Sequence, residues 1–215
     1  MDGCDISREA LAIAERLAVE GDYADRLHYF ACDLDTDTLE VDKYDLCCSA
    51  AALHHVADLD HALAQIRRSL YPDGLLVQME YVEPTRFQWS DKVQLIMNRI
   101  LEILPESYRM SIPLPGVVKG PLTRPSVEAV AAADPSEAVR SGEILSRLQQ
   151  SFEILYRADF GGTLLQFVLA DIAGNFKADN SKDRAILELM ILLEETLICE
   201  QVIPSDFVMV VARPL

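Results

Sequence analysis

Two adjacent histidines, His54 and His55, are the residues whose type and placement point most directly to chemistry. An imidazole titrates close to neutral pH, so a histidine that faces a bound molecule can take a proton from an oxygen or nitrogen nucleophile. We therefore predict that His55 is a general base and that His54 contacts the substrate. In the alternative, structural role, one ring hydrogen-bonds the backbone while the other packs against the following helix.

The elements around the histidine pair predict where it lies in the fold. Residues 44–49 are a short apolar run typical of a strand buried on both faces, and residues 74–82 are a second one. Between them, Asp58 can cap a helix whose apolar positions share one face: Leu59, Leu63, Ile66 and Leu70. Such a helix joins parallel strands as a crossover. The loop 50–57, which holds both histidines, then opens at the carboxyl edge of the sheet, where open α/β folds bind ligands.

Three further polar residues are candidates for substrate contact. Glu80 and Tyr81 end the second strand at the rim of the predicted pocket, where they could orient a substrate. Arg109 lies in a proline-rich segment, residues 105–125, that we expect to cover the carboxyl edge as an irregular loop. Each has an alternative: a satisfied strand end for Glu80 and Tyr81, and an ion pair with a nearby carboxylate for Arg109.

A resemblance to a known family makes these expectations more specific. The stretch YDLCCSAAALHHVADLDHALAQIRRSLYPDGLLV, residues 44–77, resembles the fourth-to-fifth-strand region of class I S-adenosylmethionine-dependent methyltransferases. In that family an xDxVxxxxxLHHxxD loop precedes a helix and an LxPGG turn; here Asp73 replaces the first glycine of the turn. GCDISREALAIA is similar to the family's second strand and next helix, and ACDL to the end of its third strand. PSEAVRSGEIL, FGGTLLQFVLADIAGNF and SDFVMVVARP extend the resemblance through the C-terminal half.

The resemblance implies a fold and a division of the chain. The fold would be α/β, with a Rossmann-like, mostly parallel sheet flanked by helices, an antiparallel last strand and a helical cap. Residues 1–84 would form a partial cofactor-binding core, 85–150 inserted helices and a lid loop, and 151–215 the C-terminal strands and cap helices of the same domain. Within these parts, helices are predicted at 89–104, 127–133, 135–150, 162–176 and 182–199.

The same resemblance implies a cofactor, S-adenosyl-L-methionine, and the residues that bind it. Asp5 would accept hydrogen bonds from both ribose hydroxyls, and Ile6 would pack on the adenine. Asp33 would accept from the adenine amino group, with the Leu34 backbone beside it, and Ala50 would adjoin the cofactor at the start of the histidine loop. A carboxylate suits a diol because it is a bidentate acceptor. The alternative is that Asp5 and Asp33 are ordinary strand-end caps.

One part of the family pattern is absent from the sequence. The family's first strand and its glycine-rich DxGxGxG loop would lie before residue 1, and no later segment supplies them. That strand is central in the family's sheet, so the strands on either side would have unpaired edges. Either those strands meet directly, another segment fills the gap, or the natural protein is longer. We expect a truncated chain that binds cofactor poorly and can form a homodimer through the unpaired edges.

The composition of the chain limits the kinds of partner that we expect. The chain has 215 residues, half of them hydrophobic, and a net charge of −16. Nucleic acid is excluded as an expected partner, because binding it depends on neutralising phosphates with Lys and Arg. No apolar run approaches the roughly 20 residues that span a bilayer. The five cysteines lack metal-ligand spacing, so we predict reduced thiols, a cytoplasmic location and no metal site.

The sequence therefore predicts methyl transfer from S-adenosyl-L-methionine to a small-molecule acceptor. Because the sulfonium is already activated, catalysis would come mainly from positioning. The alternative is a non-catalytic, methyltransferase-like module that acts in binding or assembly. The sequence does not distinguish methylation of oxygen, nitrogen or carbon.

Overall fold

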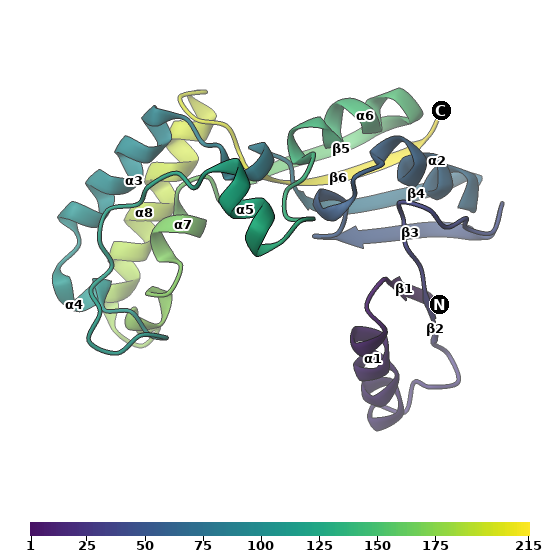
Figure 1. Cartoon of the computed structure of the whole chain (residues 1–215), viewed down its shortest axis with the longest axis horizontal. Coiled ribbons are helices and arrows are strands. Elements are labelled where there is room, and N and C mark those ends of the chain that lie inside the picture. The colour runs from purple at the N-terminus through teal and green to yellow at the C-terminus, as the bar shows by residue number, and fades with distance from the viewer.

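The computed structural model describes residues 1–215 and shows an α/β chain with two separate sheets (Figure 1). In the first sheet β1 (Asp2–Asp5) and β2 (His28–Ala31) pair in parallel, connected by α1 (Arg8–Glu20). The second sheet contains four strands in the order β3–β4–β6–β5. Their bounds are Tyr44–Ala50 for β3, Leu70–Tyr81 for β4, Phe152–Gly161 for β5 and Phe207–Pro214 for β6.

The strand directions confirm the predicted α/β class. β3 and β4 are parallel, whereas β6 runs antiparallel to both of its neighbours, β4 and β5. The last strand thus lies antiparallel inside an otherwise parallel sheet, as expected. The crossover helix between β3 and β4 is α2 (Leu59–Ser69), and the Asp58 side chain caps it by accepting from His61 N at 3.0 Å.

The other helices have the following bounds. Short helical turns are η1 (Leu53–His55), η2 (Thr85–Phe87), η3 (Ser141–Glu143) and η4 (Ala173–Asn175). The α-helices are α3 (Asp91–Ile103), α4 (Glu106–Arg109), α5 (Val127–Ala133), α6 (Ile144–Ser151), α7 (Leu165–Leu169) and α8 (Ser181–Cys199). Helices α3, α4, α7 and α8 gather at one end of the molecule, and the β1–α1–β2 unit lies beside β3 at the other (Figure 1).

β1 and β3 do not pair with each other, and no strand of the chain pairs with both. Side-chain contacts link them instead: the Tyr44 hydroxyl donates to Asp2 Oδ2 at 2.7 Å, and Lys43 Nζ lies 3.0 Å from the same oxygen. A cavity of about 240 Å³ lies between the two strands, lined by residues such as Cys4 and Leu46. The flanking strands therefore neither meet directly nor receive a third strand from this chain.

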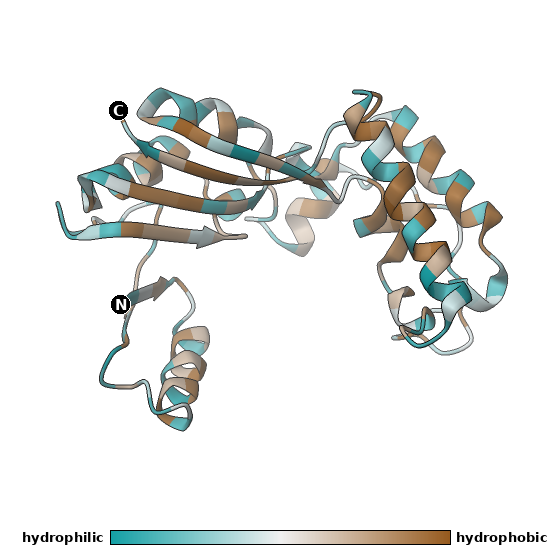
Figure 2. Ribbon diagram, turned by 180° about the vertical axis from the view of Figure 1, so that it is seen from behind, coloured by the Kyte–Doolittle hydropathy of each residue, from teal (hydrophilic) through white to brown (hydrophobic).

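The larger sheet is covered on one face only. Helices α2 and α6 pack on that face, where Leu63, Ile66, Leu148 and Val210 are among the buried side chains of one cluster. On the opposite face Met79 and Met209 are register partners and both are exposed, as are Leu46 and Tyr156. The strands of this sheet carry hydrophobic segments, coloured brown, between hydrophilic ones (Figure 2).

A second hydrophobic cluster stabilises the group of helices α3, α4, α7 and α8, called the helical unit below. It joins α3, α7 and α8 through side chains that include Met97, Leu101, Leu164, Val168 and Met190. The division of the chain at residues 84 and 150 stays a prediction. Hydrophobic packing divides the chain differently: α6 packs in the first cluster, with the four-stranded sheet, whereas α8 packs in the second cluster, with α3 and α7.

Two predicted helices are shorter in the structure than expected. The helix predicted at 135–150 begins only at Ile144, because Ala138 has a left-handed φ of 47° and Val139 N donates to His54 O at 3.1 Å. The helix predicted at 162–176 is interrupted where Asp171 adopts a φ of 65°. In the helix predicted at 135–150, the hydrogen bond from Val139 N to His54 O thus keeps the residues before Ile144 in a turn. None of the helices combines the length and apolar character that crossing a bilayer requires.

Candidate active site

Glu80, near the end of β4, fixes the histidine loop to the sheet. Its side chain is fully buried. Oε2 accepts hydrogen bonds from Ala52 N at 3.0 Å and Leu53 N at 2.7 Å, and Oε1 accepts from Tyr81 N at 2.9 Å. Oε1 also lies 2.5 Å from Nδ1 of His54. Four donors therefore surround this buried carboxylate, which compensates for its loss of water.

His54 is held by this carboxylate and is itself nearly buried. Because the Glu80 carboxylate can only accept, the network assigns the ring proton to His54 Nδ1 and leaves a lone pair on Nε2. Nε2 points to the segment after α5, where it lies 3.8 Å from Oε1 of Glu137. The His54 ring also lies edge-on to Tyr81, with ring centroids 6.1 Å apart.

The His55 ring is also held through its Nδ1, but by a serine hydroxyl in place of a carboxylate. Its Nδ1 lies 3.0 Å from the Ser136 hydroxyl, which donates its own proton to Asp134 Oδ1 at 2.7 Å. These hydrogen bonds from Ser136 lower the pKa of the Asp134 carboxyl, so that group is an acceptor at neutral pH. Ser136 must then accept from His55 Nδ1, and the lone pair of His55 is on Nε2. A bare Nε2 is what a general base requires.

His55 and Ser136 line a cavity that also contains most of the predicted cofactor residues. The cavity has a volume of about 340 Å³, within the range of roughly 300–1,000 Å³ that is usual for small-molecule sites. It lies between the β1–β2 edge and the histidine loop. Its walls are Cys4, Asp5, Ile6, Cys32, Asp33, Leu34, Asp35, Ala51, Ala52, His55, Val56 and Ser136.

The carboxylates of this cavity are partly engaged by the backbone. Asp5 Oδ1 accepts from Ser7 N at 2.7 Å, and Asp33 Oδ1 accepts from Asp35 N at 2.9 Å. Both are therefore local caps, as in the alternative considered above, but Asp5 is also exposed and faces the cavity. Ala50 pairs with Met79 in the sheet, and the two residues after it line the cavity instead.

Comparison with known proteins agrees with this architecture. Residues 1–76 match a family described as a methyltransferase domain. No curated protein matches the sequence. Among solved structures, a S-adenosylmethionine-dependent methyltransferase from Mesorhizobium loti aligns over 99% of this chain and 79% of its own, with 20% identity and a TM-score of 0.51. The fold is that of the class I S-adenosylmethionine-dependent methyltransferases.

Two other similar structures show how widely this methyltransferase fold is used. Geranyl diphosphate C-methyltransferase from Streptomyces coelicolor A3(2), solved with S-adenosyl-L-homocysteine, aligns over 100% of this chain and 61% of its own, at 12% identity and a TM-score of 0.58. The (4+2)-cyclase SpnF aligns over 99% and 65%, at 16% identity and a TM-score of 0.51. The chain thus spans between 61% and 79% of the length of these three structures. At such identities the likeness establishes the fold.

Two predicted substrate residues are placed away from the cavity of this methyltransferase fold. The Tyr81 hydroxyl donates to Pro84 O at 3.0 Å, and burial raises the pKa of that hydroxyl. Arg109 belongs to α4, at the far end of the helical unit (Figure 1). It donates from Nε to Leu104 O at 3.1 Å and from Nη1 to Lys119 O at 3.0 Å, so it links the end of α3 to the proline-rich segment.

Three residues of the site have no recognisable signal in the sequence: Asp134, Ser136 and Glu137. They follow α5 in a turn that reaches the histidine loop, although more than 75 residues separate them from it (Ser136 and His55 are 81 residues apart). Arg86 stabilises this turn by donating to the carbonyls of Pro135 at 2.7 Å and Glu137 at 2.8 Å. The sequence predicts that Pro135 starts a helix, and only the contacts with His54 and His55 show that these residues form a turn.

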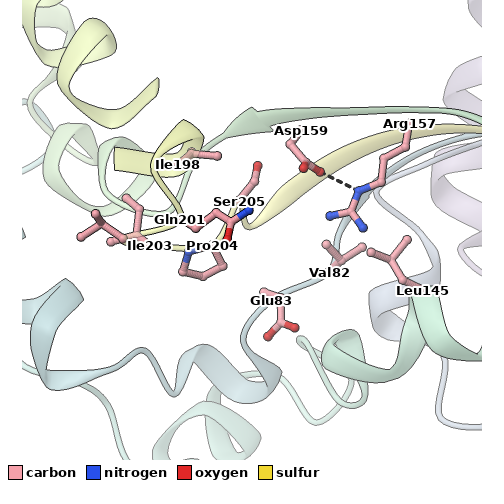
Figure 3. A pocket seen from close by; sticks show the side chains of 11 residues that line it. Val82, Glu83, Leu145, Arg157, Asp159, Ile198, Gln201, Ile203, Pro204 and Ser205 are labelled. Atoms are coloured by element: carbon pink, nitrogen blue, oxygen red, sulfur yellow. Dashed lines mark hydrogen bonds and ion pairs between the residues drawn. The ribbon is translucent and has the colours of Figure 1, made fainter. Parts of the chain in front are cut away.

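A larger cavity lies at the junction of the sheet and the helical unit (Figure 3). Its volume is about 490 Å³, and its walls include Val82 and Glu83 after β4, Arg157 of β5 and Pro204 before β6. Arg157 Nε donates to Asp159 Oδ1 at 2.8 Å across one wall. No predicted site residue lines this cavity.

A buried carboxyl lies beside that junction. Asp206 is fully buried; its Oδ1 accepts from the Thr163 hydroxyl at 3.0 Å, and its Oδ2 has no partner. Burial raises the pKa of Asp206 to about 8, and the carboxylates of Glu83 and Glu194 add to the effect. Asp206 is therefore protonated in the folded protein at neutral pH.

Proposed function

We propose that the protein binds S-adenosyl-L-methionine in the cavity between β1–β2 and the histidine loop, and transfers its methyl group to a small-molecule acceptor. The observation that carries this proposal is the arrangement of the cavity walls. Asp5, Ile6, Asp33 and Leu34, assigned to the cofactor by motif, line one cavity together with His55. These residues come from segments far apart in the sequence, so their convergence is a property of the fold.

Each wall residue suits one part of the cofactor. The exposed Asp5 carboxylate can accept from the ribose diol through Oδ2, which has no hydrogen bond within the protein. Ile6 is also exposed and would gain burial by packing on the adenine ring. Asp33 would accept from the adenine amino group, beside the Leu34 backbone.

His55 is the residue we propose to act on the acceptor. Its Nε2 lone pair, assigned through Ser136 and Asp134, could take the proton of a hydroxyl or amine as the methyl group arrives. Such a base leaves Asp134 and Ser136 in a positioning role, because they hold the ring in one tautomer. The low exposure of the neighbouring His54 makes it a support for the loop more than a substrate contact.

Calorimetry with S-adenosyl-L-homocysteine tests the proposal. A cofactor site predicts saturable heat with one ligand bound per chain, and loss of that heat in Asp5→Ala but not in a control variant, Asp25→Ala, whose carboxylate lies outside the cavity. No heat with the folded chain would contradict cofactor binding.

The second candidate is a non-catalytic module that acts in binding or assembly. The observation that favours it is the pair of unmatched strand edges on β1 and β3, which can accept a strand from another molecule. A homodimer through these edges is part of this proposal. Sedimentation of the chain with and without S-adenosyl-L-homocysteine separates the candidates: a dimer that binds no ligand supports the module, and a monomer that binds ligand supports the enzyme.

A further inference from the structure

His54, His55 and Glu137 each place one potential metal-ligand atom in the same small region. One ring nitrogen of each histidine and one oxygen of Glu137 lie within 4.8 Å of one another. Two ligands of a tetrahedral zinc ion, each about 2.0–2.1 Å from the metal, lie about 3.4 Å apart. The separation of 3.8 Å between His54 Nε2 and Glu137 Oε1 is close to that value. Small side-chain movements would complete the geometry.

We infer that His54, His55 and Glu137 form a binding site for a divalent transition-metal ion beside the cofactor cavity. Two imidazoles and one carboxylate are a ligand set that suits zinc, cobalt, nickel or iron and leaves coordination positions open. Neither the family match nor the motif assignments place a metal here. No pattern in the sequence indicates this site, because Glu137 is more than 80 residues from the two histidines.

The residues behind the three ligands are arranged as metal sites require. A histidine that binds a metal through Nε2 usually donates its Nδ1 proton to a carboxylate, carbonyl or similar acceptor, which fixes the tautomer and raises the basicity of the ligand. His54 has the buried Glu80 carboxylate in that position at 2.5 Å. His55 has the Ser136 hydroxyl at 3.0 Å, itself bonded to Asp134. Both ring orientations are thus fixed without a metal.

Backbone hydrogen bonds fix the turn that carries the third ligand, Glu137. Arg86 Nη1 donates to Glu137 O at 2.8 Å, Arg86 N donates to Ala138 O at 2.9 Å, and Val139 N donates to His54 O at 3.1 Å. The turn that carries Glu137 is therefore bonded directly to the loop that carries the histidines. The Glu137 carboxylate itself accepts no hydrogen bond and is 28% exposed, so it can approach a cation without breaking a contact.

A metal at this point would bear on the acceptor chemistry. His55, one of the three ligands, also lines the cofactor cavity, so an ion bound here would lie next to that cavity. A cation bound there can take an acceptor oxygen as a ligand and lower the pKa of its hydroxyl. It also occupies the His55 lone pair, so in the metal-loaded protein the cation replaces His55 as the activating group. This consequence rests on the proposed function, whereas metal binding does not.

Titration of the full, chelator-stripped chain with cobalt(II) chloride tests the inference. We expect one cobalt ion per chain and visible absorption bands of nitrogen- and oxygen-ligated cobalt. Glu137→Gln keeps the size of the side chain and should lower the affinity at least about tenfold, the scale seen when even outer partners of metal sites are changed. His61→Ala removes an exposed histidine outside the cluster and should leave affinity unchanged.

Three results would overturn the metal site: no stoichiometric binding, equal affinity in the wild type and Glu137→Gln, or the intense sulfur-to-cobalt absorption that would place the ion on cysteines. His54→Ala is a weaker test, because removing the partner of buried Glu80 can unfold the loop. Binding of S-adenosyl-L-homocysteine is measured on the same samples. Ligand binding without metal binding contradicts the metal site alone, and metal binding without ligand binding contradicts the proposed function alone.

Discussion

Nδ1 of His54 lies 2.5 Å from Oε1 of Glu80, so the histidine loop is attached to the end of β4 by a charge-assisted hydrogen bond inside the protein. The same carboxylate accepts three backbone N–H groups, two of them from the loop. The position of His55 beside the cofactor cavity depends on this attachment, because His55 follows His54 directly. Glu80 is therefore a positioning residue for the site.

Glu80→Gln should destabilise the protein. The amide offers one acceptor oxygen in place of two and places an NH₂ group against backbone donors. Because hydrogen bonds to charged groups contribute roughly 1.5–3 kcal/mol each, we expect the free energy of unfolding to fall by about 2–4 kcal/mol, measured by urea denaturation. Glu153→Gln is the control: this exposed carboxylate pairs with Arg213, and its loss should cost less than about 1 kcal/mol. Equal losses in the two variants would argue against the attachment.

Asp5→Ala should weaken binding of S-adenosyl-L-homocysteine. Two hydrogen bonds from the ribose diol to a charged acceptor would be lost, each worth roughly 1.5–3 kcal/mol. That loss corresponds to a fall in affinity of about a hundredfold or more, which calorimetry detects. Circular dichroism checks that α1 survives the loss of the Asp5–Ser7 hydrogen bond. An unchanged affinity in the folded variant would remove Asp5 from the cofactor site.

His55→Ala should lower turnover more than it lowers cofactor affinity. Removal of a general base typically costs a factor of about 10²–10⁴ in rate. The measurement is transfer of a labelled methyl group to small-molecule hydroxyl and amine acceptors, beside calorimetry of the same variant. Ser136→Ala keeps the imidazole but removes the acceptor that fixes its tautomer, so its rate should fall between those of the wild type and His55→Ala. Parallel losses of rate and affinity in His55→Ala would make His55 part of the binding wall instead.

Asp206 should make stability fall as pH rises. In the unfolded chain this carboxyl ionises near its ordinary pKa of 3.8, whereas in the folded protein it keeps its proton up to about pH 8. Between these values the unfolded chain binds fewer protons, so the free energy of unfolding decreases with pH, by at most about 1.4 kcal/mol per unit from this group. Above about pH 8 its contribution becomes constant.

Asp206→Asn should flatten that part of the pH profile and raise stability near pH 8 relative to the wild type. Urea denaturation at several pH values measures both effects. Asp159→Asn serves as the matched control, because the Asp159 side chain is 38% exposed and already pairs with Arg157. The raised pKa would be refuted if the two variants had the same pH profile as the wild type.

The local elements and much of the cofactor wall can be predicted from the amino-acid sequence. Apolar runs and the Asp58 cap placed β3, α2 and β4, since strand burial and helix capping depend on neighbouring residues. The motif residues Asp5, Ile6, Asp33 and Leu34 do line one cavity. Their position follows from strand ends that meet at one edge of a parallel sheet. Their roles toward a cofactor stay predictions.

The surroundings of the two histidines, in contrast, follow from the folding of distant segments against each other. The place of Glu80 at a strand end predicts a substrate contact, which stays a prediction, whereas only the fold shows that four donors surround its carboxylate. Ser136 and Glu137 had no signal in the sequence, because their partners are about 80 residues away and a turn can be told from a helix start only by what it contacts. Hydrogen bonds between distant segments carry no periodicity, so no local pattern predicts them.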